Sequence, residues 1–167
     1  MEIKKGKAFK FGDDISTDHI APGRLFHLRS NLEEFSKHVL EDADPTFASS
    51  MQKGDFVVAG NNFGLGSSRE HAPQIIKIAG VGAVLAKSFA RIFYRNAINI
   101  GLLAIECDTD KIDAGDELEL HIEEGILKNL TKNIEIKIMP LPPVMVKLLN
   151  DGGLVEHIKK NGDFNFA

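Results

Sequence analysis

The segment of this sequence best suited to chemistry is a glycine-rich stretch, NNFGLGSSREH, at residues 61–71. Its glycine pair lets the backbone approach a ligand closely, and a following helix would offer unpaired N–H groups with a positive partial charge. Arg69 can bind a carboxylate through two parallel hydrogen bonds. Ser67 and Ser68 add two hydroxyls beside it. The stretch therefore predicts a small-anion site that also holds a possible nucleophile or base.

A simpler interpretation is that Ser67 and Glu70 form a capping box, S-x-x-E, at the start of a helix. Pro73 argues against it, because it would then be the sixth helical residue and would cost about 3 kcal/mol there. The helix is expected to begin nearer Glu70 or His71. The side chains of Ser67 and Ser68 would then be free.

Two other interpretations of this stretch fit less well. A dinucleotide site would follow from Gly64-x-Gly66, but Arg69 stands where the third glycine belongs, and the next strand ends in Lys87 rather than an acid. A serine hydrolase would need the G-x-S-x-G elbow, which GLGSSR lacks.

A second group of polar residues, STDHI, follows the first predicted strand. Asp18 beside His19 could orient a substrate or a neighbouring arginine, and the alternative is an Asx turn with a solvated histidine. Arg24, His27 and Arg29 form a positive cluster just beyond it. From spacing alone, surface charge explains that cluster.

Alternating strands and helices are predicted to position the glycine-rich stretch. The expected elements are strand 56–60, helix 71–79, strand 80–86, helix 89–97 and strand 101–106. Strands that read as continuous apolar runs between helices indicate buried parallel βαβ units. On the second helix, Phe89, Ile92 and Phe93 are expected to face the core, with Arg91 and Arg95 on another face.

The flanking sequence predicts a first strand over 2–11 and a helix over 31–41 with Asn31 as N-cap. Residues 116–129 and 131–139 alternate with period two, as antiparallel strands do, around a turn at Glu124-Gly125. A final helical stretch is expected over 142–162. We therefore expect one mixed α/β domain over residues 1–167, with a parallel βαβ centre and antiparallel strands near the C-terminus.

Composition narrows the class of protein. The chain has 167 residues, 43% of them hydrophobic, and a net charge of −4, which predicts a packed core and argues against nucleic-acid binding. A single cysteine, Cys107, excludes a disulfide framework and a self-contained iron–sulfur cluster. Since no signal-peptide core and no apolar run of ~18 residues is present, a cytoplasmic protein without a membrane segment is expected.

The segments FKFGDDISTDHIAPGR, NNFGLGSSREHAP and AKSFARIFYRNAINIG together resemble the small subunits of 3-isopropylmalate dehydratases, in the aconitase superfamily. The resemblance covers nearly the whole chain and implies a swivelling three-layer β/β/α domain. It implies a hydro-lyase of leucine biosynthesis that acts on a small hydroxy dicarboxylic acid. It also implies a large partner subunit that carries a [4Fe–4S] cluster, because such enzymes need three cluster thiolates and this chain has one thiol.

The resemblance also implies residue roles. Ser67 matches the catalytic base that takes a proton from the carbon next to the carboxylate. Ser68 and Arg69 match residues that bind substrate carboxylate. Asp18 matches an active-site aspartate that holds the arrangement together, and His19 is its neighbour. No metal ligand is implied in this chain.

In this family the loop after STDHI recognises the substrate's side group. Here this loop contains both apolar residues and Arg29. Apolar residues suit an isopropyl group, whereas an arginine suits a distal carboxylate. Homoaconitase-type and dimethylmalate- or citramalate-type dehydratases therefore remain alternatives. From another class, a stand-alone small-anion or nucleotide-binding module is the non-enzymatic alternative.

Overall fold

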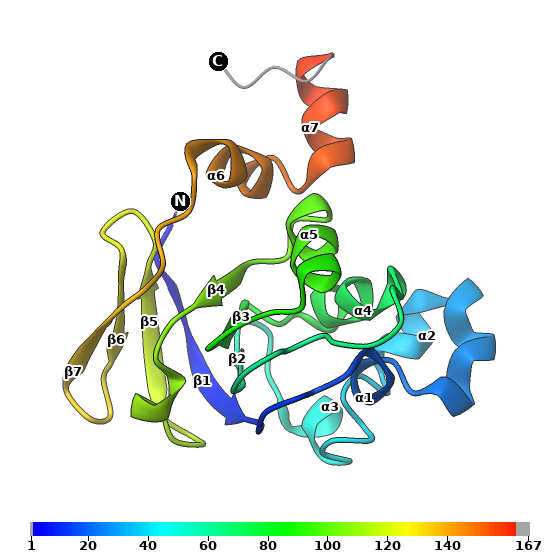
Figure 1. Cartoon of the computed structure of the whole chain (residues 1–167), viewed down its shortest axis with the longest axis horizontal. Helices are drawn as coiled ribbons and strands as arrows, with labels where there is room; N and C mark the ends of the chain where they lie inside the picture. Colours follow the sequence, from blue (N-terminus) through cyan, green and yellow to red (C-terminus); the bar gives the residue numbers. More distant parts are fainter. Residues whose placement is uncertain (1, 163–167) are drawn as a thin grey trace.

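The apolar runs of the sequence form the strands of a mixed sheet in this computed structural model, which describes residues 2–162. Met1 and residues 163–167 of the expected domain lie outside the described residues. The strands are β1 (Lys4–Lys10), β2 (Phe56–Val58), β3 (Ala83–Ala86), β4 (Ala104–Glu106), β5 (Glu117–His121), β6 (Ile126–Asn129) and β7 (Ile134–Lys137). Seven strands are hydrogen-bonded in the order β4-β3-β2-β1-β5-β6-β7 (Figure 1).

Strands β1 to β4 are the parallel half of this sheet. The crossovers from β2 to β3 and from β3 to β4 run through α4 (His71–Ala79) and α5 (Arg91–Asn99). Strands buried on both faces need no polar alternation, which is why they read as continuous apolar runs. The predicted parallel βαβ centre is confirmed.

Strands β5 to β7 are the antiparallel half, and β5 pairs with β1 at the centre of the sheet. Leu118 and Leu120 are buried on β5, while Glu117 is exposed and Glu119 half-buried between them. The turn between β5 and β6 contains Gly125 at φ 71°, a left-handed conformation that suits glycine. The predicted antiparallel strands and their turn are therefore present.

Two apolar clusters divide the molecule into three layers. Val57 and Val84 point to one side of the parallel half, where they pack with residues of α4 and α5. Phe56 and Leu85 point to the other side, where they pack with buried residues of β5 to β7. The hydrogen-bonded sheet thus folds back on itself, and its antiparallel half covers the parallel half. This confirms the expected β/β/α fold.

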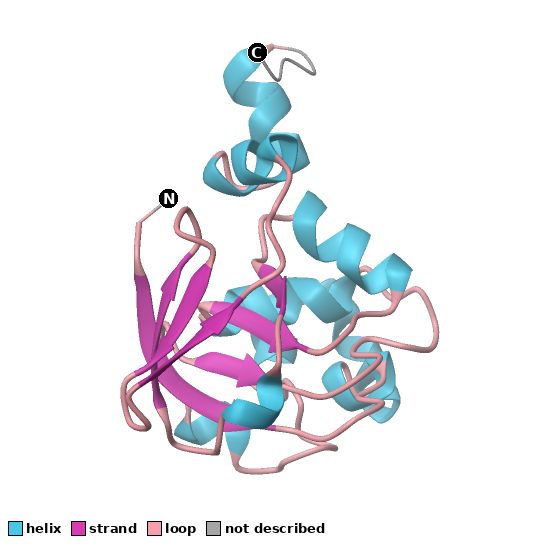
Figure 2. Ribbon diagram, turned by 60° about the vertical axis from the view of Figure 1, so that its left-hand side comes forward, coloured by secondary structure: helices cyan, strands magenta, loops and turns pink. Residues whose placement is uncertain are grey.

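The final helical stretch is two helices and not one. Helices α6 (Pro143–Asn150) and α7 (Leu154–Asn161) lie next to α5 and project beyond the sheet (Figures 1 and 2). Gly153 separates them at φ 114°, and a Cβ there would lie 2.4 Å from the carbonyl oxygen of Asn99. The backbone approaches α5 too closely for a side chain, so the helix breaks at a glycine.

The segment between β1 and β2 folds into short helical pieces. They are α1 (Thr17–Ile20), the 3₁₀ helix η1 (Gly23–Ser30), α2 (Leu32–Ser36) and α3 (Phe47–Ser50), and a second 3₁₀ helix, η2 (Thr109–Lys111), follows β4. Asn31 caps α2 as predicted, its side chain accepting a hydrogen bond from the Glu34 amide. The helix is shorter than the expected 31–41, because the chain then runs through turns to Leu40, which is buried at φ 57°. Among the described helices, none has the length and apolar character needed to span a bilayer.

Candidate active site

The serine-bearing loop runs from the end of β2 to the start of α4 and is fastened to the segment that precedes α1. The Gly64 amide donates to the carbonyl of Ile15 at 2.7 Å, and the Thr17 amide donates to the carbonyl of Leu65 at 2.9 Å. The Thr17 hydroxyl donates to the carbonyl of Ser67 at 3.0 Å. Two segments about 50 residues apart in the sequence are therefore held as one piece of backbone.

Helix α4 begins at His71, as the position of Pro73 predicted. Its N-cap residue is Glu70, and no side chain caps it. Ser67 and Ser68 are exposed, and within residues 2–162 no hydrogen bond engages the Ser67 hydroxyl. The capping-box interpretation is therefore wrong, and both hydroxyls face solvent.

Arg69 joins the two motifs directly. Its guanidinium lies 2.5 Å from a carboxylate oxygen of Asp18 and donates to the carbonyl of Ala21 at 3.1 Å. The Arg69 side chain is 20% exposed and that of Asp18 is 65% exposed. Both contacts are made by Nη1, so this end of the rigid guanidinium fork is held while its other donors are left for a carboxylate. Asp18 thus orients an arginine, one of the two roles expected of it.

His19 caps the N-terminus of α1 together with Ser16. Its amide donates to the Ser16 hydroxyl at 3.2 Å, and its Nδ1 accepts from the Ser16 amide at 2.9 Å. This reciprocal pair is a capping box, which the sequence did not reveal because a histidine replaces the usual Glu or Gln. Because Nδ1 accepts, Nε2 is the ring nitrogen that could face a substrate.

The two arginines of the positive cluster in η1 have different partners. Arg24 forms exposed ion pairs with Glu41 and Asp42 in the turn after α2. Arg29 instead donates to the carbonyl of Phe26 at 3.1 Å and lies over that ring, with its Cζ 4.4 Å from the centroid. The Cζ of Arg69 lies 5.6 Å from the same ring centroid. The structure therefore brings Arg29 to the neighbourhood of Arg69.

His71, the first residue of α4, lies beneath this group. Its ring packs edge-on against Phe26 and stacks on Phe35, with centroid distances of 5.4 and 5.5 Å. Burial, with the charges of Arg69 and Arg29, lowers the pKa of His71 below its ordinary value. Its Nε2 is buried and has no hydrogen-bond partner within the part of the chain that the structure describes. A neutral ring therefore supports Phe26 from below.

A cavity of about 300 Å³ opens beside the serines. On one side its lining comes from Thr17, Gly64, Gly66, Ser67, Ser68 and Arg69, and on the other from Ala90, Arg91, Ile92, Phe93 and Asn96. It thus combines the two serine hydroxyls and Arg69 of the loop with Arg91 and the first turns of α5.

The α5 side of the cavity was not expected from the sequence. Phe93 is buried and Phe89 half-buried, but the prediction that Ile92 faces the core is wrong, since it is 51% exposed. The buried positions of α5 are Phe93, Ala97 and Ile98, and one residue turns a helix by about 100°. Ile92 therefore lies off the buried stripe and borders the cavity.

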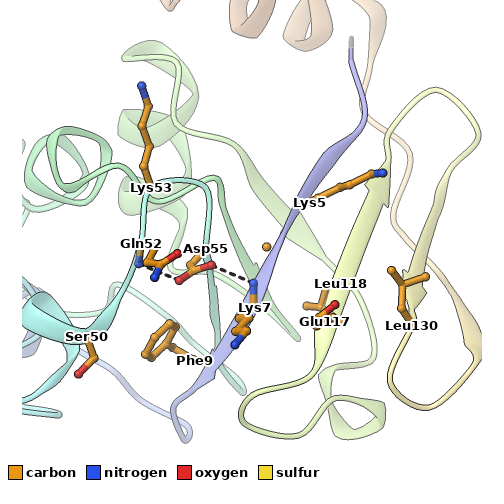
Figure 3. A pocket seen from close by; sticks show the side chains of 11 residues that line it. Lys5, Lys7, Phe9, Ser50, Gln52, Lys53, Asp55, Glu117, Leu118 and Leu130 are labelled. Atoms are coloured by element: carbon orange, nitrogen blue, oxygen red, sulfur yellow. Dashed lines mark hydrogen bonds between the residues drawn. The ribbon is translucent and has the colours of Figure 1, made fainter.

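A second and larger hollow, of about 520 Å³, lies between β1, β5 and the turn before β2 (Figure 3). The Asp55 carboxylate at its floor accepts hydrogen bonds from the backbone amides of Lys7 and Gln52. The side chains of Lys5 and Lys53 extend away from one another in Figure 3. Their charges do not converge, and no residue expected in the active site lines this hollow.

Comparisons with known proteins give the family of this chain. A family model for the aconitase C-terminal domain matches residues 26–110. The chain is 65% identical over 158 residues to "3-isopropylmalate dehydratase small subunit 2" of Archaeoglobus fulgidus, covering 95% of this chain and 96% of that protein. It is 62% identical over 161 residues to "3-isopropylmalate dehydratase small subunit 1" of Thermotoga maritima, covering 96% and 97%. The chain belongs to the 3-isopropylmalate dehydratase small-subunit family.

A solved member of this family has the same fold. The crystal structure of 3-isopropylmalate dehydratase from Methanocaldococcus jannaschii superposes with a TM-score of 0.92 at 45% sequence identity, covering 96% of each chain. Membership of the dehydratase family confirms the hydro-lyase class that the resemblance implied. A small subunit also implies a large-subunit partner.

The iron–sulfur cluster that the resemblance implied does not fit the residues of this chain. Cys107 is the only cysteine in the sequence, and burial, followed by the charge of Asp108, raises its pKa to about 12. A thiol must lose its proton to bind a metal, so this one is a poor ligand. Across residues 2–162, no three His, Cys, Asp or Glu side chains gather closely enough to hold a metal ion.

Proposed function

We propose that this chain is the catalytic small subunit of a dehydratase that interconverts 2-isopropylmalate and 3-isopropylmalate by loss and return of water. The observation that carries the proposal is the placement of an exposed Ser67 hydroxyl and the Asp18-bound guanidinium of Arg69 on one cavity. The names of the most similar relatives support the choice of substrate.

In the proposed reaction, the deprotonated oxygen of Ser67 takes the proton from the carbon next to a substrate carboxylate. A serine hydroxyl is a weak base in water, so the oxygen must be stabilised by nearby positive charge and by backbone N–H groups. Arg69 two residues away and the start of α4 supply both. In the rehydration step that gives the isomer, Ser67 returns the proton to the neighbouring carbon, which lost the hydroxyl, and the hydroxyl adds to the carbon that lost the proton.

The carboxylates of the substrate are assigned to the remaining site residues. Arg69 and Ser68 hold the carboxylate next to the reacting carbon, and Asp18 keeps the guanidinium in plane. Arg29 binds the second carboxylate from η1, and the Nε2 of His19 is assigned to substrate binding beside Asp18. Arginine suits this task because a guanidinium and a carboxylate match as two parallel hydrogen bonds.

The large subunit supplies what these residues lack. Its [4Fe–4S] cluster would act as a Lewis acid on the departing hydroxyl. The open side of the cavity beside Ser67 suits closure by such a partner, because excluding water strengthens the contacts of Arg69 with a carboxylate.

The test is reconstitution of this chain with its large subunit under anaerobic conditions, followed by activity with isopropylmalate, homoaconitate, citrate and dimethylmalate side by side. We expect a strong preference for isopropylmalate. A preference for homoaconitate or citrate would assign Arg29 to a third carboxylate and overturn the proposed substrate. A chain that binds small anions but gives no turnover with any large subunit would be a binding module instead.

A further inference from the structure

Phe26 is a large apolar residue that remains 40% exposed beside the candidate site. Two guanidinium groups adjoin its ring, Arg29 at 4.4 Å and Arg69 at 5.6 Å from the centroid. Both distances lie within the range in which a cation is attracted to an aromatic face. One ring therefore contacts both arginines to which the proposed function gives a carboxylate.

The attachment of Arg29 to Phe26 is twofold. Its guanidinium donates to the Phe26 carbonyl at 3.1 Å and also lies over the Phe26 ring. An arginine on an exposed 3₁₀ segment would otherwise have many rotamers, and fixing a long side chain costs conformational entropy. The ring removes much of that freedom before a substrate arrives.

Phe26 is itself fixed from below by the ring of His71, and His71 stacks on the fully buried Phe35. The column of rings therefore connects η1 to α4 and α2. Because α4 directly follows the loop that carries Ser67 and Arg69, the position of Phe26 is set by the same helix as the position of the base.

We propose that Phe26 is a positioning residue that holds Arg29 and Arg69 beside one another, so that the two guanidiniums meet the two carboxylates of one substrate. Like charges repel each other, and the electron-rich face of the aromatic ring that both guanidiniums adjoin offsets part of that repulsion. The proposal rests on the proposed function in assigning carboxylates to both arginines. It extends that function by naming the residue that sets their spacing.

The first test concerns the full small subunit alone and needs no activity. Aromatic ring currents should shift the δ-methylene proton signals of Arg29 upfield in the NMR spectrum of the wild type. Phe26→Tyr keeps the aromatic face and should keep the shift, whereas Phe26→Leu keeps apolar volume and should lose it. An unchanged Arg29 signal in Phe26→Leu would show that the ring does not hold this arginine and would overturn the proposal.

The second test uses the reconstituted enzyme with 3-isopropylmalate. Phe26→Leu should raise KM about tenfold with a smaller change in kcat, as loss of two cation–aromatic contacts implies, and Phe26→Tyr should stay within about twofold of wild type. In an Arg29→Gln background, Phe26→Leu should raise KM by a clearly smaller factor. Equal losses in both backgrounds would show that Phe26 does not act through Arg29 and would contradict the proposal.

These measurements separate the proposal from the proposed function. If the wild-type pair fails to turn over isopropylmalate, the proposed function fails, while the NMR comparison still decides what Phe26 does. If turnover is normal and Phe26→Leu leaves KM unchanged, the proposed function stands and the role of Phe26 is refuted.

Discussion

Arg69 is oriented before any substrate binds, because one of its guanidinium nitrogens, Nη1, contacts both Asp18 and the carbonyl of Ala21. The Ser67 hydroxyl two residues earlier has no such partner within the described residues, although its own carbonyl is fixed by Thr17. The backbone of the base is thus held while its side chain is free to rotate. These two residues should therefore respond differently to substitution.

For Ser67→Ala we expect kcat of the reconstituted enzyme to fall by at least ~10²–10⁴, the usual contribution of a general base, with KM little changed. The measurement is steady-state kinetics, with gel filtration to show that the two subunits still associate. Ser50→Ala, an exposed serine on α3, is the matched control and should turn over like wild type. Normal turnover by Ser67→Ala would remove the serine-base assignment.

For Arg69→Lys we expect kcat/KM to fall at least about tenfold although the charge is kept, because an ammonium cannot hold Asp18, Ala21 and a carboxylate in one plane. Arg24→Lys is the control, since within residues 2–162 Arg24 pairs with Glu41 and Asp42, at the surface and outside the cavity. Exposed pairs contribute little, so its kinetics should match wild type. Similar losses in both variants would point to a general charge effect and away from a carboxylate site at Arg69.

Among the elements, the loop from β2 to α4 depends on a glycine at its centre. Gly64 has φ 87°, and a Cβ there would lie 2.2 Å from the Phe93 ring on α5. We expect Gly64→Ala to lower the free energy of unfolding by about 2–4 kcal/mol, from left-handed backbone strain together with overlap in the core.

The control for this glycine is Gly115→Ala. Gly115 has a similar φ of 85°, but nothing lies within 4 Å of an added Cβ. Gly115→Ala should lower the free energy of unfolding by only about 1 kcal/mol, because it introduces backbone strain without steric overlap. Urea denaturation of both variants separates strain from overlap, and equal losses would show that the contact with α5 does not matter.

The contact of α4 with η1 and α2 makes stability depend on pH through His71. Burial, together with the charges of Arg69 and Arg29, lowers the pKa of His71 in the folded chain. At a pH between this lowered value and the unfolded pKa near 6.5, the unfolded chain therefore binds more protons than the folded chain. Stability should therefore be lost as pH falls below about 6.5. His71→Phe keeps a ring in the stack and should weaken this dependence. Thermal melts from pH 7.5 to 5.5 test it, and identical slopes would contradict it.

At the scale of the whole molecule, the sheet doubles back so that Leu85 lies between its parallel and antiparallel halves, fully buried. Leu85→Ala should lower the free energy of unfolding by about 2–5 kcal/mol. If residues 2–162 form one cooperative domain, far-UV circular dichroism and the fluorescence of Tyr94 on α5 should report a single transition. Leu130→Ala, exposed after β6, is the control with little expected effect. Two separate transitions would indicate two folding units.

The sequence predicted those parts of the fold that local patterns determine. Pro73 placed the start of α4 at His71, and apolar runs placed β2, β3 and β4. Period-two alternation placed β5, β6 and β7, and Asn31 was correctly read as a cap. In each case neighbouring residues carry the physical cause, so a single sequence is sufficient.

What the sequence missed depends on contacts between distant segments. The break at Gly153 follows from the approach of α6 and α7 to Asn99, and the exposure of Ile92 follows from which side of α5 meets the sheet. The role of Phe26 could not be predicted, because two of its three partners, Arg69 and His71, lie outside η1 and more than 40 residues away in the sequence. The roles of Ser67, Ser68, Arg69, Asp18, Arg29 and His19 remain predictions that the experiments above address.

The hydrogen bonds that join Ile15 and Thr17 to the loop that carries Ser67 have a consequence for assembly. They are already formed in the isolated small subunit, so association with the large subunit does not have to select one conformation of this loop from many. What the large subunit must still arrange is the rotation of a few side chains and the removal of solvent. The backbone of this half of the site is thus preorganised before the two subunits associate.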